Sequence, residues 1–157
     1  MVVCSIREFA GPQTQFLQLA SDNAKELIAA AKFENVLHLK STPWRPTSNS
    51  KIERVMQMVG DGVRTLLVQS GLPPSWWPYA AQAWCMGRNV AEADDGEPSA
   101  WRLRHGAGFQ GKLIPFGAEV IFRLPRPYRS GGKFGPYGAR GAFLGWALQP
   151  GMCWKGD

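Results

Sequence analysis

The stretch TPWRPTSNSKIERVMQMV, residues Thr42 to Val59, decides how the middle of the chain folds. Prolines stiffen its first half, and a Ser-x-x-Glu sequence, Ser50 to Glu53, then opens a helical apolar pattern. Such a sequence is a capping box, whose two side chains satisfy free backbone N–H groups at a helix start. A carboxylate in this position can also bind a divalent metal together with a second carboxylate. Both roles of Glu53 stay open at this point, and they can coexist.

The residues after this loop predict two helices. Apolar side chains recur every three or four residues, as on one face of a helix, at Ile52, Val55, Met56, Val59, Val63, Leu66 and Leu67. We therefore expect a helix over Ile52–Gln69 that stops at Gly71. A second helix is expected from Trp76 to about Val90, with Ser75 as its N-cap.

The residues before the loop predict a strand–helix–strand unit. Phe16–Ser21 is apolar without a helical period, Ala24–Phe33 is a helix candidate, and Asn35–Ser41 is a second short strand. Asp22 directly follows the first strand, where open α/β sheets collect ligand groups. Asp22 and Glu53 are therefore candidate ligands for magnesium or manganese, which support phosphodiester chemistry.

The last third of the chain changes from helical apolar periods to short alternating strands. Glu92–Gly111 is expected to be a linker, and short alternating strands follow in PFGAEVIFRL and GARGAFLGWAL. A turn-rich basic loop, PRPYRSGGKFGPYGAR, separates them. We expect a small β-module with an aromatic core of Phe116, Phe122, Phe143 and Trp146.

The net charge of +6 is unevenly spread. Residues 1–92 hold nine Lys and Arg against seven Asp and Glu, whereas residues 98–156 hold nine against one. A basic half of this kind favours a polyanionic partner, nucleic acid above all, with a merely solubilising surface as the alternative. The candidate phosphate contacts in the basic loop are Arg126, Arg129 and Lys133.

Several classes of protein are disfavoured. The cysteines, Cys4, Cys85 and Cys153, are odd in number and widely spaced, so neither a disulfide framework nor a zinc site is expected, and we expect them to be buried small hydrophobes. His38 and His105 are the only histidines, and His38 is expected to be an ordinary strand residue. No apolar run approaches the roughly 18 residues of a membrane span, and no signal peptide is expected.

Four segments, taken in order, resemble a known family. They are SDNAKE at 21–26, TPWRPTSNSKIER at 42–54, SGLPPSWWPYAAQAW at 70–84 and PFGAEVIFRL…GARGAFLGW further on. The chain resembles the integrases of LTR retrotransposons, especially the copia type. The resemblance implies an RNase H-like core, whose triad of two aspartates and a glutamate holds two magnesium ions and which nicks and joins DNA ends. It also implies a small SH3-like module after the core.

The resemblance assigns roles residue by residue. Asp22 matches the second aspartate of the triad and Glu53 matches the glutamate. Asn49 matches the polar residue before the glutamate helix, and Lys51 and Arg54 stand where the family often places basic residues that face DNA.

The departures concern the rest of the site. Ala24 and Ser50 replace glycines of the family pattern, and the 31 positions from Asp22 to Glu53 are fewer than usual. The first aspartate has no counterpart, because Glu8 is the only acid before Asp22. The family's zinc-binding module is missing too. We therefore expect an N-terminally truncated integrase that begins inside the core and is catalytically incomplete alone.

The fold expected is α/β: a partial RNase H-like core at residues 1–91, a linker at 92–113 and an all-β SH3-like module at 114–157. The implied cofactor is Mg²⁺ or Mn²⁺. The implied partner is DNA, with RNA as an alternative and a homo-oligomer as a further option, and no membrane. Such a protein is expected inside the cell, and in the nucleus if it works as an integrase. A non-catalytic nucleic-acid-binding remnant and a structural fragment stay open as alternatives.

Overall fold

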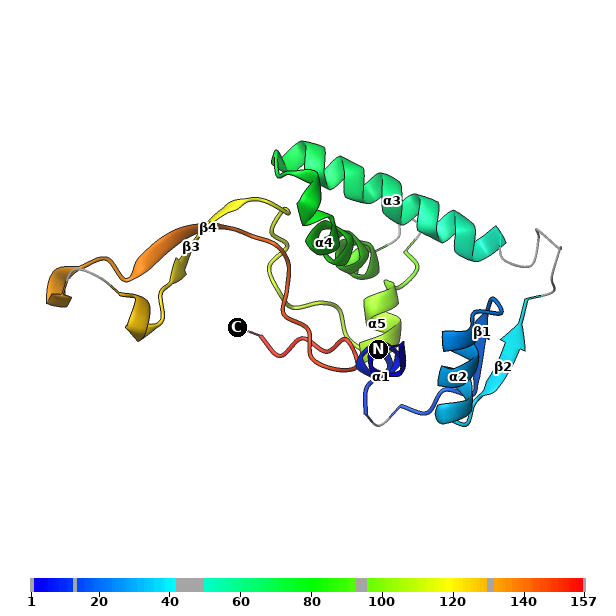
Figure 1. Ribbon diagram of the computed structural model, residues 1–157. Coiled ribbons are helices and arrows are strands. Elements are labelled where there is room, and N and C mark those ends of the chain that lie inside the picture. Colours follow the sequence, from blue (N-terminus) through cyan, green and yellow to red (C-terminus); the bar gives the residue numbers. More distant parts are fainter. Residues whose placement is uncertain (1, 13, 42–49, 93–95, 130–131, 157) are drawn as a thin grey trace. The chain divides into compact units, whose positions relative to one another are not determined.

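The protein is a mixed α/β chain with small sheets (Figure 1). The computed structural model describes residues 2–12, 14–41, 50–92, 96–129 and 132–156 of the 157. None of the helices in these ranges is both long enough and apolar enough to cross a membrane.

Two compact units make up the chain. One comprises Met1–Met58 together with Trp146–Asp157, and the other comprises Val59–Gly145. The domain boundaries expected from the sequence, at residues 92 and 113, stay a prediction.

The first unit contains the expected strand–helix–strand. β1 (Gln18–Ser21) and β2 (Leu37–Lys40) pair in parallel, and α2 (Lys25–Phe33) connects them. Parallel neighbours require such a crossover, because a tight turn can join only antiparallel strands. Ala30 and Ala31 are the buried residues of α2. The strand–helix–strand prediction is confirmed, with shorter strands than expected.

The helix α1 (Val2–Ala10) belongs to the same unit and contacts α2. Arg7 near its end pairs with Glu34, which caps α2, through an Nε–Oε1 hydrogen bond of 2.9 Å. The C-terminal segment returns to this helix, because the Gly151 N–H donates to the Glu8 carbonyl at 2.7 Å. The two ends of the chain are thereby joined within one unit.

The long helix expected from the apolar period is α3 (Ser50–Ser70). It ends at Gly71, whose φ of +67° is the left-handed conformation that glycine adopts readily. A short 3₁₀ turn, η2 (Pro74–Trp76), then leads into α4 (Trp77–Val90). The expectation that Ser75 caps α4 is wrong: Trp76 takes that place without a side-chain bond, because Ser75 lies inside η2.

The core of the second unit lies between α3 and α4. Its buried members are Val63, Ala80, Ala83 and Phe116, and the partly buried Val59, Leu66, Leu67, Leu72, Ala81 and Leu144 surround them. The apolar face of α3 is used only from Val59 onwards. Its first turns leave Ile52, Val55 and Met56 more than half exposed.

The expected linker contains a helix, α5 (Ala100–His105), which contacts α4. Ser99 caps it by accepting a hydrogen bond from the Arg102 N–H at 3.2 Å. Trp101 is buried, with its ring 4.2 Å from that of His105 and 5.1 Å from that of Phe109. The segment expected to be a linker thus contains a short helix with a buried tryptophan, which the local sequence does not reveal.

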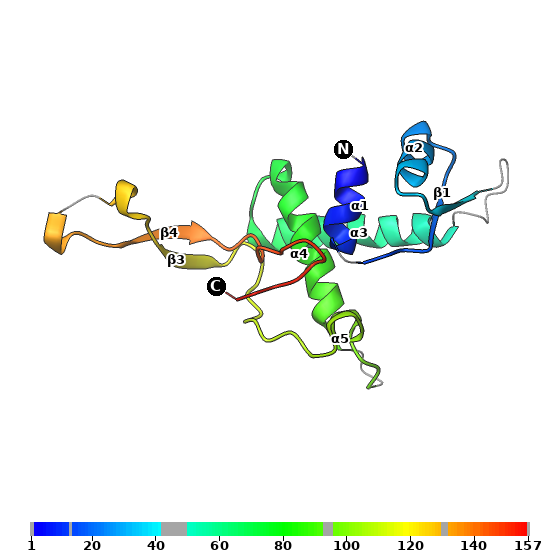
Figure 2. The same cartoon turned by 90° about the horizontal axis from the view of Figure 1, so that it is seen from below.

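The last third forms a hairpin rather than a barrel in the part of the chain that is described. β3 (Glu119–Arg123) and β4 (Gly138–Ala142) run antiparallel with Glu119 opposite Ala142 (Figures 1 and 2). The turns η3 (Arg126–Tyr128) and η4 (Gly132–Phe134) lie between them. The strands are thus confirmed, and the SH3-like module is not.

The predicted aromatic core of this module is wrong. Phe116 is buried among residues of α3 and α4 instead, whereas Phe122 in β3 is 47% exposed. Trp146 belongs to the other compact unit. A two-stranded ribbon has no interior, so its aromatic residues either reach a neighbouring core or stay in solvent.

The cysteines are all free, and their predicted burial holds only in part. Cys4 is exposed, while Cys85 and Cys153 are half-buried. Cys4 lies on α1, where only Ala10 is buried.

Candidate acidic and nucleic-acid sites

Asp22 stands at the carboxyl end of β1, as the sequence predicts. Its Oδ1 accepts a hydrogen bond from the Ala24 N–H at 3.2 Å, a turn that leads the chain into α2. Asn23 donates from Nδ2 to the Ser41 carbonyl at 3.3 Å, which ties the ends of the two parallel strands together. Asp22 is exposed, so its carboxylate is open to a ligand from solvent.

Glu53 lies in the first turn of α3. A carboxylate is favourable there, because the free N–H groups of a helix start carry partial positive charge. Lys51 and Arg54 flank it, and all three side chains are exposed. Asn49 and the rest of the loop 42–49 lie outside the described residues.

The acidic pair does not amount to a two-metal centre. Carboxylate oxygens are suitable ligands for magnesium or manganese. Among the described residues, however, no three side chains of the His, Cys, Asp or Glu types gather where they could hold one ion. Asp22 and Glu53 have suitable donor atoms, but in the described part of the chain they are too few to form the ligand set of a metal ion.

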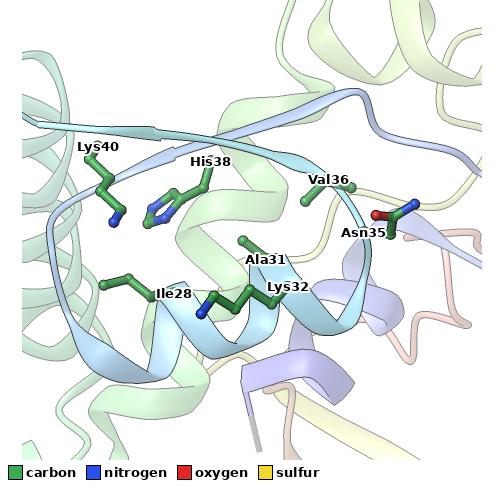
Figure 3. A pocket seen from close by; sticks show the side chains of 7 residues that line it. All are labelled: Ile28, Ala31, Lys32, Asn35, Val36, His38 and Lys40. Carbon is green, nitrogen blue, oxygen red and sulfur yellow. The ribbon is translucent and has the colours of Figure 1, made fainter.

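A cavity of about 310 Å³ lies between α2 and β2 in the first unit (Figure 3). Its lining combines apolar side chains with the cationic Lys32 and Lys40 and with His38. His38 is a strand residue, as expected, and its Nε2 lies 2.7 Å from the Ser21 hydroxyl oxygen. Its Nδ1 is buried with no hydrogen-bond partner in the described part of the chain. The imidazole thus holds the two strands together beside Asp22.

The basic residues predicted to bind nucleic acid lie in and around the 3₁₀ turns between β3 and β4. Arg126 in η3 and Lys133 in η4 are exposed, as side chains that reach phosphates must be. Arg140 in β4 is exposed as well, but it pairs with Glu119 across the ribbon at 3.3 Å.

Arg129 differs from its neighbours. It is half-buried, and its Nε donates to the Leu124 carbonyl at 2.8 Å. Its guanidinium carbon lies 4.9 Å from the centre of the Tyr137 ring, within the range of a cation–π contact. Arg129 therefore braces the turn, and Arg126 and Lys133 are the freer cations.

Sequence reasoning missed the aromatic residues of this turn region. Phe134 is 93% exposed, Tyr128 73% and Tyr137 48%. The signal was present in the alternation of aromatic and basic residues in Pro-Tyr-Arg and Lys-Phe-Gly-Pro-Tyr. The charge of this loop alone does not distinguish such aromatic residues from buried ones.

Comparisons with known proteins are sparse. No protein-family model matches the chain, and no curated protein matches it. Among solved structures, the chain is similar to one chain of the cryo-EM structure of the simian T-cell lymphotropic virus intasome in complex with PP2A regulatory subunit B56 gamma. The TM-score is 0.51 at 14% identity, over 90% of this chain and 50% of that one. This chain thus spans about half of its neighbour's length. At such low identity the similarity concerns the fold alone, and it supports an integrase-like fold.

Proposed function

We propose that the chain is part of an LTR-retrotransposon integrase of the copia type. Residues 1–91 would then be the C-terminal part of an RNase H-like core, and residues 114–157 the module that follows it. The observation that carries this proposal is the order of elements in the core. A parallel β1–α2–β2 unit has Asp22 directly after its first strand, and α3 follows with Glu53 in its first turn.

The partner in this proposal is DNA, bound through its phosphates. Residues 98–156 have eight more positive than negative side chains, and Arg126 in η3 and Lys133 in η4 are exposed. Neutralising phosphates releases condensed counterions, so binding of this kind depends on salt and little on base sequence. We expect a dissociation constant on the order of micromolar at physiological salt.

The chemistry of the proposed family needs more than this chain holds. Asp22 and Glu53 would take Mg²⁺ or Mn²⁺, which activates water and stabilises a leaving oxygen in phosphodiester transfer. A further bridging carboxylate would have to join them, because no aspartate precedes Asp22 in these residues. In this proposal the protein works in the nucleus, and self-association is one way to complete the site.

A second function is a nucleic-acid-binding protein without catalysis. The surplus of positive charge in residues 98–156 supports it, because phosphate binding needs no metal site. Both proposals include DNA binding. They differ in whether a further bridging carboxylate, added to Asp22 and Glu53, allows phosphodiester transfer.

Binding is tested by salt titration. The purified chain is mixed with a fluorescent DNA duplex, and the dissociation constant is measured over a range of salt concentrations. The double substitution Arg126→Gln with Lys133→Gln should lower the slope of log affinity against log salt by about two units, if each cation meets one phosphate.

The matched control removes the same charge elsewhere. Lys25 and Arg88 are also exposed, on α2 and α4. The slope measured for Lys25→Gln with Arg88→Gln should equal that of the parent chain. Equal slopes for all three proteins would show that the turns between β3 and β4 do not bind phosphate, and no binding at low salt would overturn the proposed DNA partner.

A further inference from the structure

Aromatic rings stand in solvent at the end of the β3–β4 ribbon. Phe134 in η4 and Tyr128 in η3 are 93% and 73% exposed. Large apolar side chains normally leave water when folding offers them a partner. The two rings lie on successive turns of one ribbon, each near a cationic side chain, and exposed apolar surface of this kind can mark an interaction site.

Phe122 in β3 is less exposed than these two rings, at 47%, because one side of its ring meets the opposite strand. The Phe122 ring lies over Gly141 on the opposite strand, where a Cβ atom would approach it to within 3.0 Å. A glycine in the partner strand therefore makes room for that ring. Neither Tyr128 nor Phe134 receives such a place in the described part of the chain.

The turns that carry these rings are well braced. Within η3, the Tyr128 N–H donates to the Pro125 carbonyl at 3.0 Å. Arg129 is held by the Leu124 carbonyl and lies over Tyr137, and the Tyr137 hydroxyl donates to the Lys133 carbonyl at 3.3 Å. These bonds hold the backbone beside each exposed ring, which lowers the conformational entropy lost on binding.

Positive charge is placed beside the rings. Lys133 Nζ lies 5.8 Å from the centre of the Phe134 ring, and Arg126 lies two residues before Tyr128. No acidic residue occurs between Glu119 and the end of β4. The turn region therefore offers flat apolar faces next to cations, which matches a ligand made of flat rings joined by anions.

We propose that this turn region binds single-stranded DNA, with bases stacked on Tyr128 and Phe134 and phosphates beside Arg126 and Lys133. A double helix hides the faces of its bases, so the aromatic rings can add affinity only where bases are unpaired. The inference rests on the proposed DNA binding and deepens it, because it names unpaired DNA as the preferred form.

The experiment separates bases from phosphates. The full chain is titrated with a single strand of about 12 nucleotides, near the usual site size for such proteins, with an abasic strand of the same length and with the matching duplex. The abasic strand has the same phosphates and no rings. We expect the single strand to bind most tightly, by about fivefold over the abasic strand for each ring that stacks.

The variants assign the effect to the two rings. Tyr128→Leu with Phe134→Leu keeps apolar bulk and removes the aromatic faces, and it should abolish the preference while leaving abasic-strand binding unchanged. Tyr128→Phe with Phe134→Tyr keeps both rings and should keep the preference. Phe9 and Phe33 are exposed in the other compact unit, so Phe9→Leu with Phe33→Leu is the matched control.

The outcomes separate the stacking of bases from the proposed DNA binding on which it rests. Equal binding of single and abasic strands, with salt dependence retained, would overturn base stacking and leave phosphate binding standing. Failure to bind any strand would overturn both. Tighter binding of an RNA strand of the same sequence would overturn the assignment to DNA, and an undiminished preference in the leucine variant would show that the bases stack elsewhere.

Discussion

At the scale of the residue, Gly62 decides how closely α3 and α4 approach. A Cβ atom built on it would collide with the indole of Trp84. Gly60, two positions earlier in the same helix, has no neighbouring atom within 4 Å of that place. The two glycines have the same propensity cost in a helix and differ in what surrounds them.

We expect Gly62→Ala to destabilise the protein. The added methyl forces the Trp84 ring to move, which costs about 1–3 kcal/mol in a packed contact. The better helix propensity of alanine offsets up to about 1 kcal/mol of that. The free energy of unfolding should therefore fall on the order of 1 kcal/mol in a urea titration followed by circular dichroism.

Gly60→Ala is the control for this substitution. It gains the same helix propensity without the collision, so stability should rise by up to about 1 kcal/mol. If both variants are stabilised, the indole does not occupy the space above Gly62 in solution.

Cys4 and Cys85 should differ in reactivity. Burial raises the pKa of the Cys85 thiol, whereas Cys4 is exposed. The thiolate is the reactive form, so we expect iodoacetamide to modify Cys4 faster near neutral pH in the folded protein. Peptide mass spectrometry measures both rates, and the difference should vanish in urea. Equal rates in the native protein would contradict the burial of Cys85.

At the scale of the element, α5 ends on His105, whose neutral form the fold favours. Burial, and then the neighbouring Arg104, lower the pKa of His105, whose ring lies on Trp101. The folded state thus disfavours the protonated ring. The stability that the neutral ring contributes is present above the ordinary histidine pKa of 6.5 and is lost as the pH falls through the lowered value.

We therefore expect His105→Phe to weaken the acid sensitivity of the protein. Phenylalanine keeps a ring against Trp101 and cannot be protonated. The melting temperature of the parent chain should fall between about pH 7.5 and about pH 5.5 by more than that of the variant. Identical falls would show that protonation of His105 is not coupled to folding.

The β1–β2 pair leaves much apolar surface in solvent. Leu37 is 61% exposed and Leu39 44%, and Leu17 just before β1 is 86% exposed. Two strands and one helix are too little to cover both faces of a parallel sheet, which is normally buried on both sides. Open sheet edges and exposed apolar side chains of this kind are the surface features that favour association with a further strand or chain.

At the scale of the whole molecule, the acidic pair limits what the chain does alone. We expect no processing or joining of DNA ends with magnesium or manganese. Two carboxylates hold one ion loosely, and placing two ions for in-line displacement takes a further bridging ligand. A gel assay with labelled DNA ends measures both reactions.

Strand transfer by the purified chain would contradict this prediction if Glu53→Gln abolished it. Glu26 is exposed on α2 and lies outside the proposed site, so Glu26→Gln is the matched control. Activity that survives both substitutions would point to a contaminating nuclease.

The sequence by itself determined the local elements. The apolar period of α3, its stop at Gly71, the strand–helix–strand around Asp22 and the strands at β3 and β4 all depend on residues within a few positions of one another. Asp22 at a strand end and Glu53 in a first helical turn follow from the same local signals. Such preferences act on neighbouring backbone groups and need no distant partner.

Only the tertiary structure decided which side chains are covered. Phe116 packs between α3 and α4, Trp101 makes α5 out of an expected linker, and the apolar stripe of α3 is buried only from Val59 onwards. The rings of Tyr128 and Phe134 stay in solvent because the described part of the chain brings no apolar surface against them. Burial depends on two surfaces that come together from distant parts of the chain. The composition of one surface alone therefore does not predict whether it is buried.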